Sequence, residues 1–451
     1  MSWPSYPRYN DSGVEWLGRV PSGWAVSPLK NVATVFPSSV DKHSHDNEIP
    51  VQLCNYTDVY KNERISGALD FMKATATPEE IKKFTLKQGD TIITKDSETA
   101  DDIGISAYVE ETLPDVLCGY HLSVVRPLPG LDGRFVKRLF DSHYLKASME
   151  VSANGLTRVG LGQYAIDNLN IPLPPPDEQL QIADFLEAET AKIDALIAKQ
   201  EHLIATLRED RTATITHAVT KGLDPTVDMV QPHNSELPAC PKHWTLLISL
   251  KRLAEVQTGL TLGKSVDPAE AVDVPYLRVA NVQTSGVNLD EVKTVAVHRS
   301  ELKRYLLRDG DVLMTEGGDI DKLGRGCVWS GEIAPCIHQN HVFAVRCSDA
   351  LSGDFLVYLL DTAVARNYFF MTAKKTTNLA STNSTTLGAF TFSLPPRAEQ
   401  DEIVDHLNER CAGLDALIAK ANAVITVLRE YRAALITDAV TGKIDVRGAV
   451  A

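Results

Sequence analysis

The 451-residue sequence predicts an α+β fold, in which two long antiparallel α-helices separate two mixed α/β domains in a pseudo-two-fold tandem repeat. Residues 177–219 carry apolar side chains at a spacing of three and four and contain no Pro or Gly, which is typical of an amphipathic helix. The hexapeptide DALIAK at 194–199 recurs unchanged at 415–420. A helix with one apolar stripe needs a partner, and two copies predict an intrachain coiled coil.

The first long helix is expected within residues 174–222. Prolines end the segment before it, Asp177 and Glu178 place negative charge at its first turn, and Gly222 follows its end. At about 1.5 Å per residue, it would be roughly 65 Å long. The second copy is expected within residues 395–443, after a matching Leu-Pro-Pro.

The apolar stripe of each long helix is expected to face the other helix, because this buries both stripes at once. The predicted pairing residues are Ile193, Leu196, Leu203, Leu207 and Ile215 on the first helix, and Leu414, Leu417, Val424, Leu428 and Ile436 on the second.

The segments before the two helices also repeat. A Gly-Asp pair at 89–90 and again at 310–311 predicts a turn that leads into a short strand. Further strands (118–127 and 338–347), helices (135–148 and 355–372) and polar loops follow in the same order in both halves. The expected domains are 1–173 and 223–394 with its linker, the spacer helices are 174–222 and 395–443, and the tail is 444–451.

Composition limits the class of protein. The sequence shows no signal peptide and no apolar run long enough to span a membrane, and seven scattered Cys favour a reducing, cytoplasmic compartment. A net charge of −14 argues against binding nucleic acid by bulk charge alone, although local basic loops remain compatible with DNA binding.

Catalytic and metal-binding motifs are missing from the sequence. The segment GLTLGKS (259–265) resembles a phosphate-binding loop but is one residue too short between its glycines. The Cys and His residues between 327 and 347 match no standard zinc spacing. We therefore predict no catalytic residue, no metal site and no cofactor bound by this chain.

Four polar loops in each half carry side chains of the kinds that contact bases and phosphates. In the first half the candidate DNA-binding residues are Asn55, Tyr56, Lys61, Arg64, Thr94, Lys95, Ser97, Tyr120, His121, Asn154, Thr157 and Arg158. In the second half they are Tyr276, Arg278, Asn281, Thr315, Lys322, Arg325, Asn340, His341, Lys374, Lys375, Thr376 and Asn378. For any one of these residues, a solvated surface or a role in a turn is the alternative. Lys137–Arg138 and Lys303–Arg304 are expected on solvated helix faces.

Taken together, the ordered motifs resemble the specificity subunit of a Type I restriction-modification system. The resemblance rests on DSGVEWLGRVPSGW (11–24), the Gly-Asp strands, the two Leu-Pro-Pro helix starts, and the endings HAVTKG and DAVTGK. It covers essentially the whole chain, although NSELPACPKHW (234–244) is only a degraded form of the first motif.

The resemblance implies two target-recognition domains that each read one half of a split, asymmetric site in double-stranded DNA. It implies that the helices set the gap and bind two modification subunits, which use S-adenosylmethionine, and that two restriction subunits using ATP and magnesium join them. The chain itself would catalyse nothing. A coiled-coil scaffold or dimerisation protein without DNA readout is the alternative, and an autonomous enzyme is disfavoured for want of a site.

Overall fold

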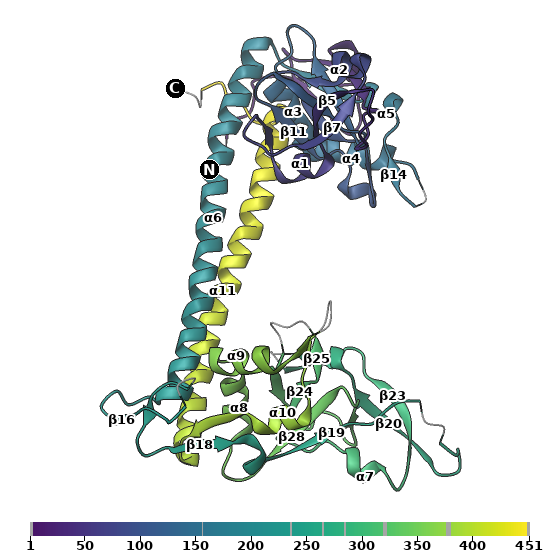
Figure 1. Cartoon of the computed structure of the whole chain (residues 1–451). Coiled ribbons are helices and arrows are strands. Elements are labelled where there is room, and N and C mark those ends of the chain that lie inside the picture. The colour runs from purple at the N-terminus through teal and green to yellow at the C-terminus, as the bar shows by residue number, and fades with distance from the viewer. Residues whose placement is uncertain are drawn as a thin grey trace. The chain divides into compact units, whose positions relative to one another are not determined.

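The computed structural model describes residues 3–155, 157–234, 237–263, 266–283, 286–318, 323–375 and 380–448 (Figure 1). The chain forms two compact units, and each is described by itself. Unit 1 comprises Met1–Gln200 and Asn422–Ala451, and unit 2 comprises Glu201–Ala421.

Two sheets form the globular part of unit 1. The first has the order β4-β13-β9-β11-β6 and the second has the order β7-β5-β12-β8. Their strands are β4 (Ala33–Pro37), β5 (Ile49–Cys54), β6 (Arg64–Ile65), β7 (Met72–Ala76), β8 (Thr85–Leu86), β9 (Thr91–Thr94), β11 (Ser106–Val109), β12 (Leu113–Cys118) and β13 (Leu122–Pro127). Short pairs are formed by β1 (Tyr9–Asp11) with β2 (Arg19–Pro21), β3 (Ala25–Pro28) with β15 (Asn170–Leu173), and β10 (Asp96–Ser97) with β14 (Val159–Gly160). The helices are α1 (Tyr56–Lys61), α2 (Pro78–Phe84), α3 (Gly133–Asp141), α4 (His143–Ser152) and α5 (Gln163–Asp167).

Unit 2 repeats this plan. One sheet has the order β19-β28-β24-β26, and another has the order β23-β20-β27. Their strands are β19 (Ala254–Thr258), β20 (Ala271–Leu277), β23 (Lys293–His298), β24 (Val312–Thr315), β26 (Gly326–Val328), β27 (Ile337–His338) and β28 (Val342–Cys347). Smaller groups are β16 (Met229–Val230) with β17 (Cys240–Pro241), β18 (Thr245–Ser249) with β31 (Thr391–Leu394), β21 (Val282–Gln283) with β22 (Gly286–Val287), and β25 (Gly317–Gly318) with β30 (Ala380–Ser381) and β29 (Lys374–Lys375). The helices are α7 (Leu302–Tyr305), α8 (Gly353–Leu360), α9 (Ala363–Thr372) and α10 (Ser384–Ala389). The predicted tandem repeat is confirmed.

The repeated Gly-Asp motif has a packing reason. Gly89 and Gly310 adopt positive φ (91° and 84°) in the turn before the strand, where a side chain would be strained. Asp90 is buried and accepts from Nε and Nη2 of Arg126 at 2.7 and 2.6 Å. Asp311 accepts from Arg346 in the same way, at 2.9 and 2.7 Å. The arginine of each later strand therefore satisfies the buried aspartate of its own unit.

The helix predicted over 135–148 is two helices, and so is the helix predicted over 355–372. Ser142 ends α3 and caps α4, where its hydroxyl accepts from the Leu145 amide. Thr362 caps α9 in the same way, accepting from the Ala365 amide. In both places, the hydroxyl accepts a hydrogen bond from a backbone amide at the start of the second helix, and this capping explains why one predicted helix is divided into two.

The long helices are continuous: α6 runs over Pro176–Lys221 and α11 over Arg397–Val440 (Figure 1). A buried glutamine anchors the start of each. Gln179 donates to the carbonyls of Pro174 and Gly130 and accepts from the Asp132 amide at 2.9 Å. Gln400 repeats these contacts with Pro395, Ala350 and the Ser352 amide. The glutamine therefore ties the helix start to the loop before α3 or α8.

Each unit contains the first half of one long helix beside the second half of the other. In unit 1, Ile182 and Leu186 of α6 and Ile436 of α11 share a core with Phe135 and Leu139 of α3. In unit 2, Ile215 of α6 and Ile403 of α11 share a core with Phe355 of α8. The antiparallel arrangement predicted for the helices is confirmed within each unit.

The buried seam between the helices differs in part from the predicted stripe. Ile193, Ile215, Leu414 and Ile436 are buried as predicted, and Leu207 and Leu428 are half-buried. The prediction is wrong for four pairing residues, whose exposed fractions are 47% for Leu196, 44% for Leu203, 49% for Leu417 and 44% for Val424. The seam instead uses the next residue, such as Ile197, Ile204 or Ile425, because one step turns a helix by about 100°.

The segment predicted as a C-terminal tail packs in unit 1 as far as the structure describes it. Val446 is fully buried, and the Asp445 amide donates to the Pro4 carbonyl at 2.7 Å. Lys443 donates to the carbonyls of Leu17 and Arg19. Described segments near both termini, at 4–19 and 443–446, thus pack together within unit 1.

Candidate nucleic-acid interface

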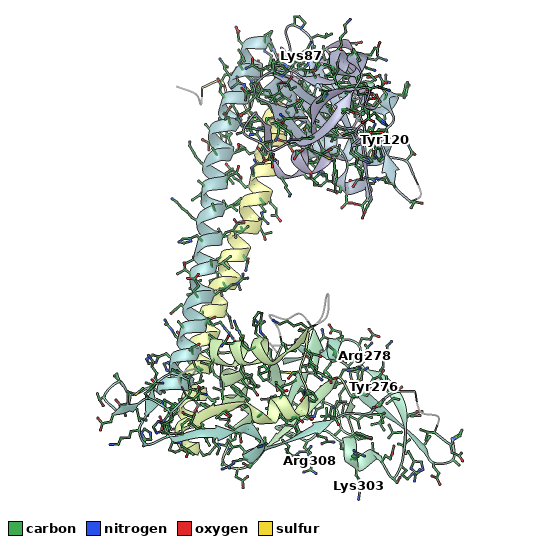
Figure 2. All side chains as sticks on the ribbon, in the orientation of Figure 1. Lys87, Tyr120, Tyr276, Arg278, Lys303 and Arg308 are labelled. Carbon is green, nitrogen blue, oxygen red and sulfur yellow. The ribbon has the colours of Figure 1, made fainter. Side chains whose placement is uncertain are left out.

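In unit 1, several polar loops meet where the parallel strands β5 and β12 end. The Gly119 amide donates to the Cys54 carbonyl at 2.9 Å, which places Asn55 and Tyr56 beside Tyr120 and His121. Tyr120 is half exposed and lies at the surface of the domain (Figure 2). This end of the sheets therefore presents side chains from two of the predicted loops to solvent.

Asp96 joins two further loops to this group. Its carboxylate contacts Nδ1 of His121 at 2.9 Å and Nη2 of Arg158 at 2.9 Å. The strand pair β10 and β14 holds Asp96 opposite Gly160, and Asn154 bridges to Gly160. All four predicted loops of the first half thus contribute to one surface.

Lys95 supports this surface from below. Its ammonium donates to the Ser38 carbonyl at 3.0 Å and lies 4.5 Å from the centre of the Tyr120 ring. Burial lowers the pKa of Lys95 because it disfavours the charged form, and the Asp96 carboxylate opposes that effect. Lys95 therefore holds the Tyr120 ring by a cation–π contact.

Unit 2 builds an equivalent surface from the same backbone contacts. The Gln339 amide donates to the Leu277 carbonyl at 2.9 Å, and the Glu316 amide donates to the His341 carbonyl at 2.9 Å. The Glu316 carboxylate contacts Nδ1 of His341 at 2.7 Å. The sheet β25-β30-β29 adds the exposed Lys374 and Lys375, and the Lys375 ammonium lies 3.8 Å from the centre of the Phe370 ring.

The structure brings about half of the predicted site residues into these two surfaces. They are Asn55, Tyr56, Lys95, Tyr120, His121, Asn154, Thr157 and Arg158 in unit 1, and Thr315, Asn340, His341, Lys374 and Lys375 in unit 2. Lys61 is exposed at the end of α1, and Arg325 is half-buried beside β26. Lys322, Thr376 and Asn378 lie outside the described residues, as do Lys264 and Ser265 of the loop-like segment GLTLGKS.

Three predicted contacts in unit 1 are corrected. Thr94 is fully buried in the central strand β9, and its hydroxyl accepts from the Ile105 amide at 3.0 Å. Ser97 is buried and donates to the Asp102 carboxylate. Arg64 pairs with Glu110 and with Glu187 of α6 at 2.6 Å, so its charge is already matched.

Three predicted contacts in unit 2 are also corrected. Asn281 is buried, and its amide closes a turn by accepting from the Arg278 amide and donating to the Asn288 carbonyl. Tyr276 packs in a small core beneath β20. The half-buried Arg278 guanidinium lies 3.4 Å from Glu291, so it supports the same turn.

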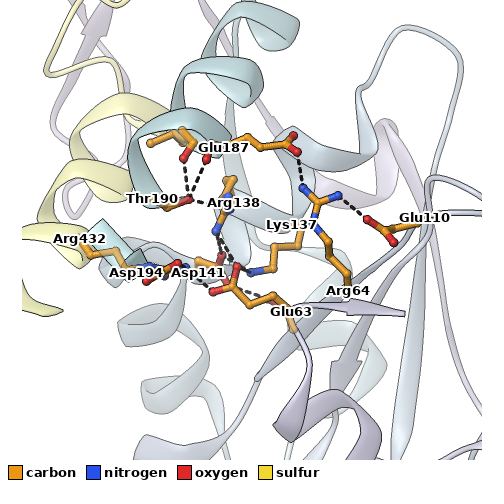
Figure 3. Close-up of polar contacts among 12 residues, drawn as sticks. Glu63, Arg64, Glu110, Lys137, Arg138, Asp141, Glu187, Thr190, Asp194 and Arg432 are labelled. Carbon is orange, nitrogen blue, oxygen red and sulfur yellow. Dashed lines mark hydrogen bonds and ion pairs between the residues drawn. The ribbon is translucent and has the colours of Figure 1, made fainter. Parts of the chain in front are cut away.

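A charged cluster that the sequence does not predict lies where the first domain meets both long helices (Figure 3). Lys137 and Arg138 of α3 were expected on a solvated face but are buried, because α3 packs against α6. Both pair with Glu63 and Asp141, and Glu63 also pairs with Arg432 of α11.

The basic residues of this cluster lower the pKa of Glu63 and keep its carboxylate ionised. Partial burial alone would raise its pKa, but Lys137, Arg138 and Arg432 outweigh this effect and lower the pKa to about 2. Arg432 also contacts Asp194 of α6 at 2.9 Å. In unit 2, the equivalent Arg211 contacts Asp415 and Asp361 at 3.4 and 3.3 Å. Each arginine thus links two long helices and one domain.

Within the described parts of the chain, no group of three or more His, Cys, Asp or Glu side chains could hold a metal ion. One helix, α11, contains a window that is long and apolar enough to cross a membrane by length and composition. The same helix packs against α6 through a buried seam and through the ion pair between Arg432 and Asp194.

Comparisons with known proteins give one consistent result. The profile of the Type I restriction modification DNA specificity domain matches residues 21–205 and 241–427. The EcoKI specificity subunit of Escherichia coli K12 is 24% identical over 439 residues, which are 95% of this chain and 90% of that protein. The StySPI specificity subunit of Salmonella potsdam is 22% identical, with the same coverage of both proteins.

Solved structures show the same fold. A chain from a type I restriction-modification system, solved to explain its complex assembly and conformational transition, has a TM-score of 0.70 at 16% identity. That match covers 96% of this chain and 99% of the other. The HsdS subunit from Thermoanaerobacter tengcongensis has a TM-score of 0.52 at 16% identity, covering 94% of this chain and 98% of the other.

Proposed function

From the premise that this chain belongs to the family of Type I restriction modification DNA specificity domains, we propose that it gives a Type I restriction-modification complex its DNA sequence specificity. Each domain would read one half of a bipartite, asymmetric site in double-stranded DNA. One observation carries the proposal: the same backbone contacts build one polar surface in each unit, but the exposed side chains differ. Similar frames with different side chains are what two unlike half-sites require.

The exposed side chains on these surfaces are of the types that contact DNA phosphates and bases. Lys374 and Lys375 can contact phosphates, whereas Asn340 and the histidines can reach base edges. Because the chain as a whole has a net charge of −14, positive charge for DNA binding is confined to these loops. Positive surface elsewhere along the DNA would come from partner subunits.

The long helices would set the gap between the half-sites and dock two modification subunits. In unit 1, Leu196 of α6 and Val424 of α11 are exposed, and each precedes a buried or half-buried seam residue by one position. In unit 2, Leu203 and Leu417 are exposed in the same way. Because the helices of a pair run antiparallel, this shared offset puts both side chains on one face of the pair. An exposed apolar face of this kind marks an interaction surface.

The chemistry would lie in the partners. We expect S-adenosylmethionine in two modification subunits, and ATP and magnesium in two restriction subunits, with no cofactor or catalytic residue on this chain. Such a complex would work in the cytoplasm. A coiled-coil scaffold without DNA readout is not favoured, because it would not need two repeated loop frames that carry different polar side chains.

The test is DNA affinity measured with the modification subunit present. A library of random duplexes should enrich one bipartite sequence, and binding should weaken steeply as salt rises. A scaffold would enrich no sequence and show no such salt dependence.

One pair of lysines gives a sharper version of this test. Replacing both Lys374 and Lys375 with Ala should weaken binding to all duplexes. The salt slope, which is the change in the logarithm of the binding constant with the logarithm of the salt concentration, should become shallower by about 0.9 per lost phosphate contact. The matched control is Lys303→Ala, an exposed lysine on α7 outside the loop surface. An unchanged salt slope in the double variant would show that these lysines do not contact phosphates.

A further inference from the structure

The two recognition surfaces share one side-chain pair. His121 is held at Nδ1 by Asp96 at 2.9 Å, and His341 is held at Nδ1 by Glu316 at 2.7 Å. Each histidine follows the amide that closes the frame, Gly119 or Gln339, at the same offset of two residues. The histidine is therefore repeated in position, whereas its carboxylate partner is shifted by one residue in the same loop: the position equivalent to Glu316 is Lys95, and Asp96 follows it.

The carboxylate determines what each imidazole offers to a ligand. A carboxylate only accepts, so Nδ1 carries a hydrogen and donates it, and in the neutral ring Nε2 is left as an acceptor. In unit 2, the Asn340 amide nitrogen, which can only donate, lies 3.5 Å from Nε2 of His341. The short Nδ1 contact sets the tautomer, the longer Asn340 contact is compatible with it, and a base amine would take the place of the Asn340 amide at Nε2.

These histidines face solvent. The side chains of His121 and His341 are 44% and 56% exposed. Within the described residues, Nε2 of His121 makes no hydrogen bond, and its ring lies edge-on to Tyr120 at 5.2 Å. By contrast, His338 is fully buried and uses Nδ1 on the Val342 carbonyl, as a framework histidine does.

We propose that His121 and His341 are specificity-determining residues, each accepting at Nε2 a hydrogen bond from the exocyclic amine of one base in its half-site. The amine is N6 of adenine or N4 of cytosine, the two amines that the major groove presents. Asp96 and Glu316 are positioning residues that fix the tautomer. The preceding residue, Tyr120 or Asn340, differs between the units and adjusts the preference for the neighbouring base. This inference rests on the proposed function.

The test uses the full chain with its modification subunit and the duplex that this complex selects, at about pH 8, above the ordinary imidazole range. Each adenine in the site is replaced in turn by purine, and each cytosine by 2-pyrimidinone, which removes one amine at a time. In the wild type, one replacement in each half-site should weaken binding roughly tenfold, as expected for a lost base contact. Whether that base is adenine or cytosine identifies the amine.

The variants His121→Phe and His341→Phe then complete a double-mutant cycle. Each should make binding insensitive to the amine replacement in its own half-site and leave the other half-site unchanged. The matched control is His243→Phe, an exposed histidine paired with Glu399 beside the start of α11, which should change neither response.

The outcomes separate the two proposals. If the wild type selects a sequence but no amine replacement weakens binding, or if the phenylalanine variants keep the full response, this inference is wrong and the proposed function stands. If a variant fails to fold, the wild-type replacement series still tests the inference, because a half-site in which no amine replacement weakens binding contradicts it. If the wild type selects no sequence at all, both proposals fall.

Discussion

At the scale of single residues, buried charges explain motifs that look arbitrary in the sequence. Asp90 is 1% exposed and satisfied by two contacts from Arg126 and one from the Lys87 amide. The same contacts recur at Asp311, Arg346 and the Arg308 amide. The Gly-Asp turn and the later arginine are thus one structural feature, although the sequence separates them.

This feature predicts a stability loss confined to one unit. Asp90→Ala leaves Arg126 partly buried without its partner, so we expect unit 1 to lose about 3 kcal/mol of unfolding free energy. Urea denaturation of the full chain, followed by hydrogen exchange in each unit, would measure it. Asp70→Ala, at an exposed position, should change stability by less than about 0.5 kcal/mol. An equal loss in both variants would contradict the role given to Asp90.

The cluster around Glu63 predicts a dependence on pH. Its pKa falls from 4.5 to about 2 on folding, so its stabilising contribution is present above pH 4.5 and is lost as pH falls toward 2. The Tm of unit 1 should therefore drop as the pH falls from about 4.5 to about 2, and Glu63→Gln should flatten that drop while lowering the Tm at pH 7. Because the Glu63 side chain is about half exposed, solvent reduces the size of the effect. A drop of the same steepness in the variant would refute this assignment.

At the scale of elements, the sequence predicted the helices better than it predicted their contacts. The spacing of apolar residues identified α6 and α11, because a stripe of that length has no other common explanation. It did not separate Leu196 from Ile197 or Leu203 from Ile204, since adjacent apolar residues fit the same stripe. Only packing against the second helix decides which one is buried.

The loops show a similar limit. The internal repeat located every loop of the two polar surfaces, because turns and strands recur in order. It did not show that Thr94 and Ser97 point inward, or that Asp96 and Glu316 hold the histidines. A polar residue is expected to be exposed when only its type is considered. Thr94 is buried because β9 is a central strand covered on both faces.

The exposed apolar residues on the helices predict a partner surface. Replacing Leu196 and Val424 with Gln should leave unit 1 within about 0.5 kcal/mol of the wild-type stability, because neither side chain is buried. The same change should weaken binding of the modification subunit, measured by calorimetry or size-exclusion chromatography. Ile193→Ala is the contrasting variant. Because Ile193 is buried, truncating its side chain should lower the free energy of unfolding by about 2–4 kcal/mol. Unchanged partner binding in the Leu196 and Val424 variant would remove this face from the docking surface.

At the scale of the whole molecule, the two long helices are the only elements that pass from one unit into the other in the described chain. If they set the gap, their length should determine the distance between half-sites. One inserted heptad in both helices, after Ala198 and after the equivalent Ala419, keeps the seam in register and adds about 10 Å.

That length corresponds to about three base pairs of B-DNA at 3.4 Å each. We expect the selected site to keep both half-sequences and to lengthen its preferred gap, with weaker binding because extra base pairs also rotate one half-site about the DNA axis. Selection from a library with gaps of varied length would measure both effects. A heptad inserted in α6 alone breaks the pairing register and should abolish selection. An unchanged gap in the doubly inserted protein would show that something other than helix length sets it.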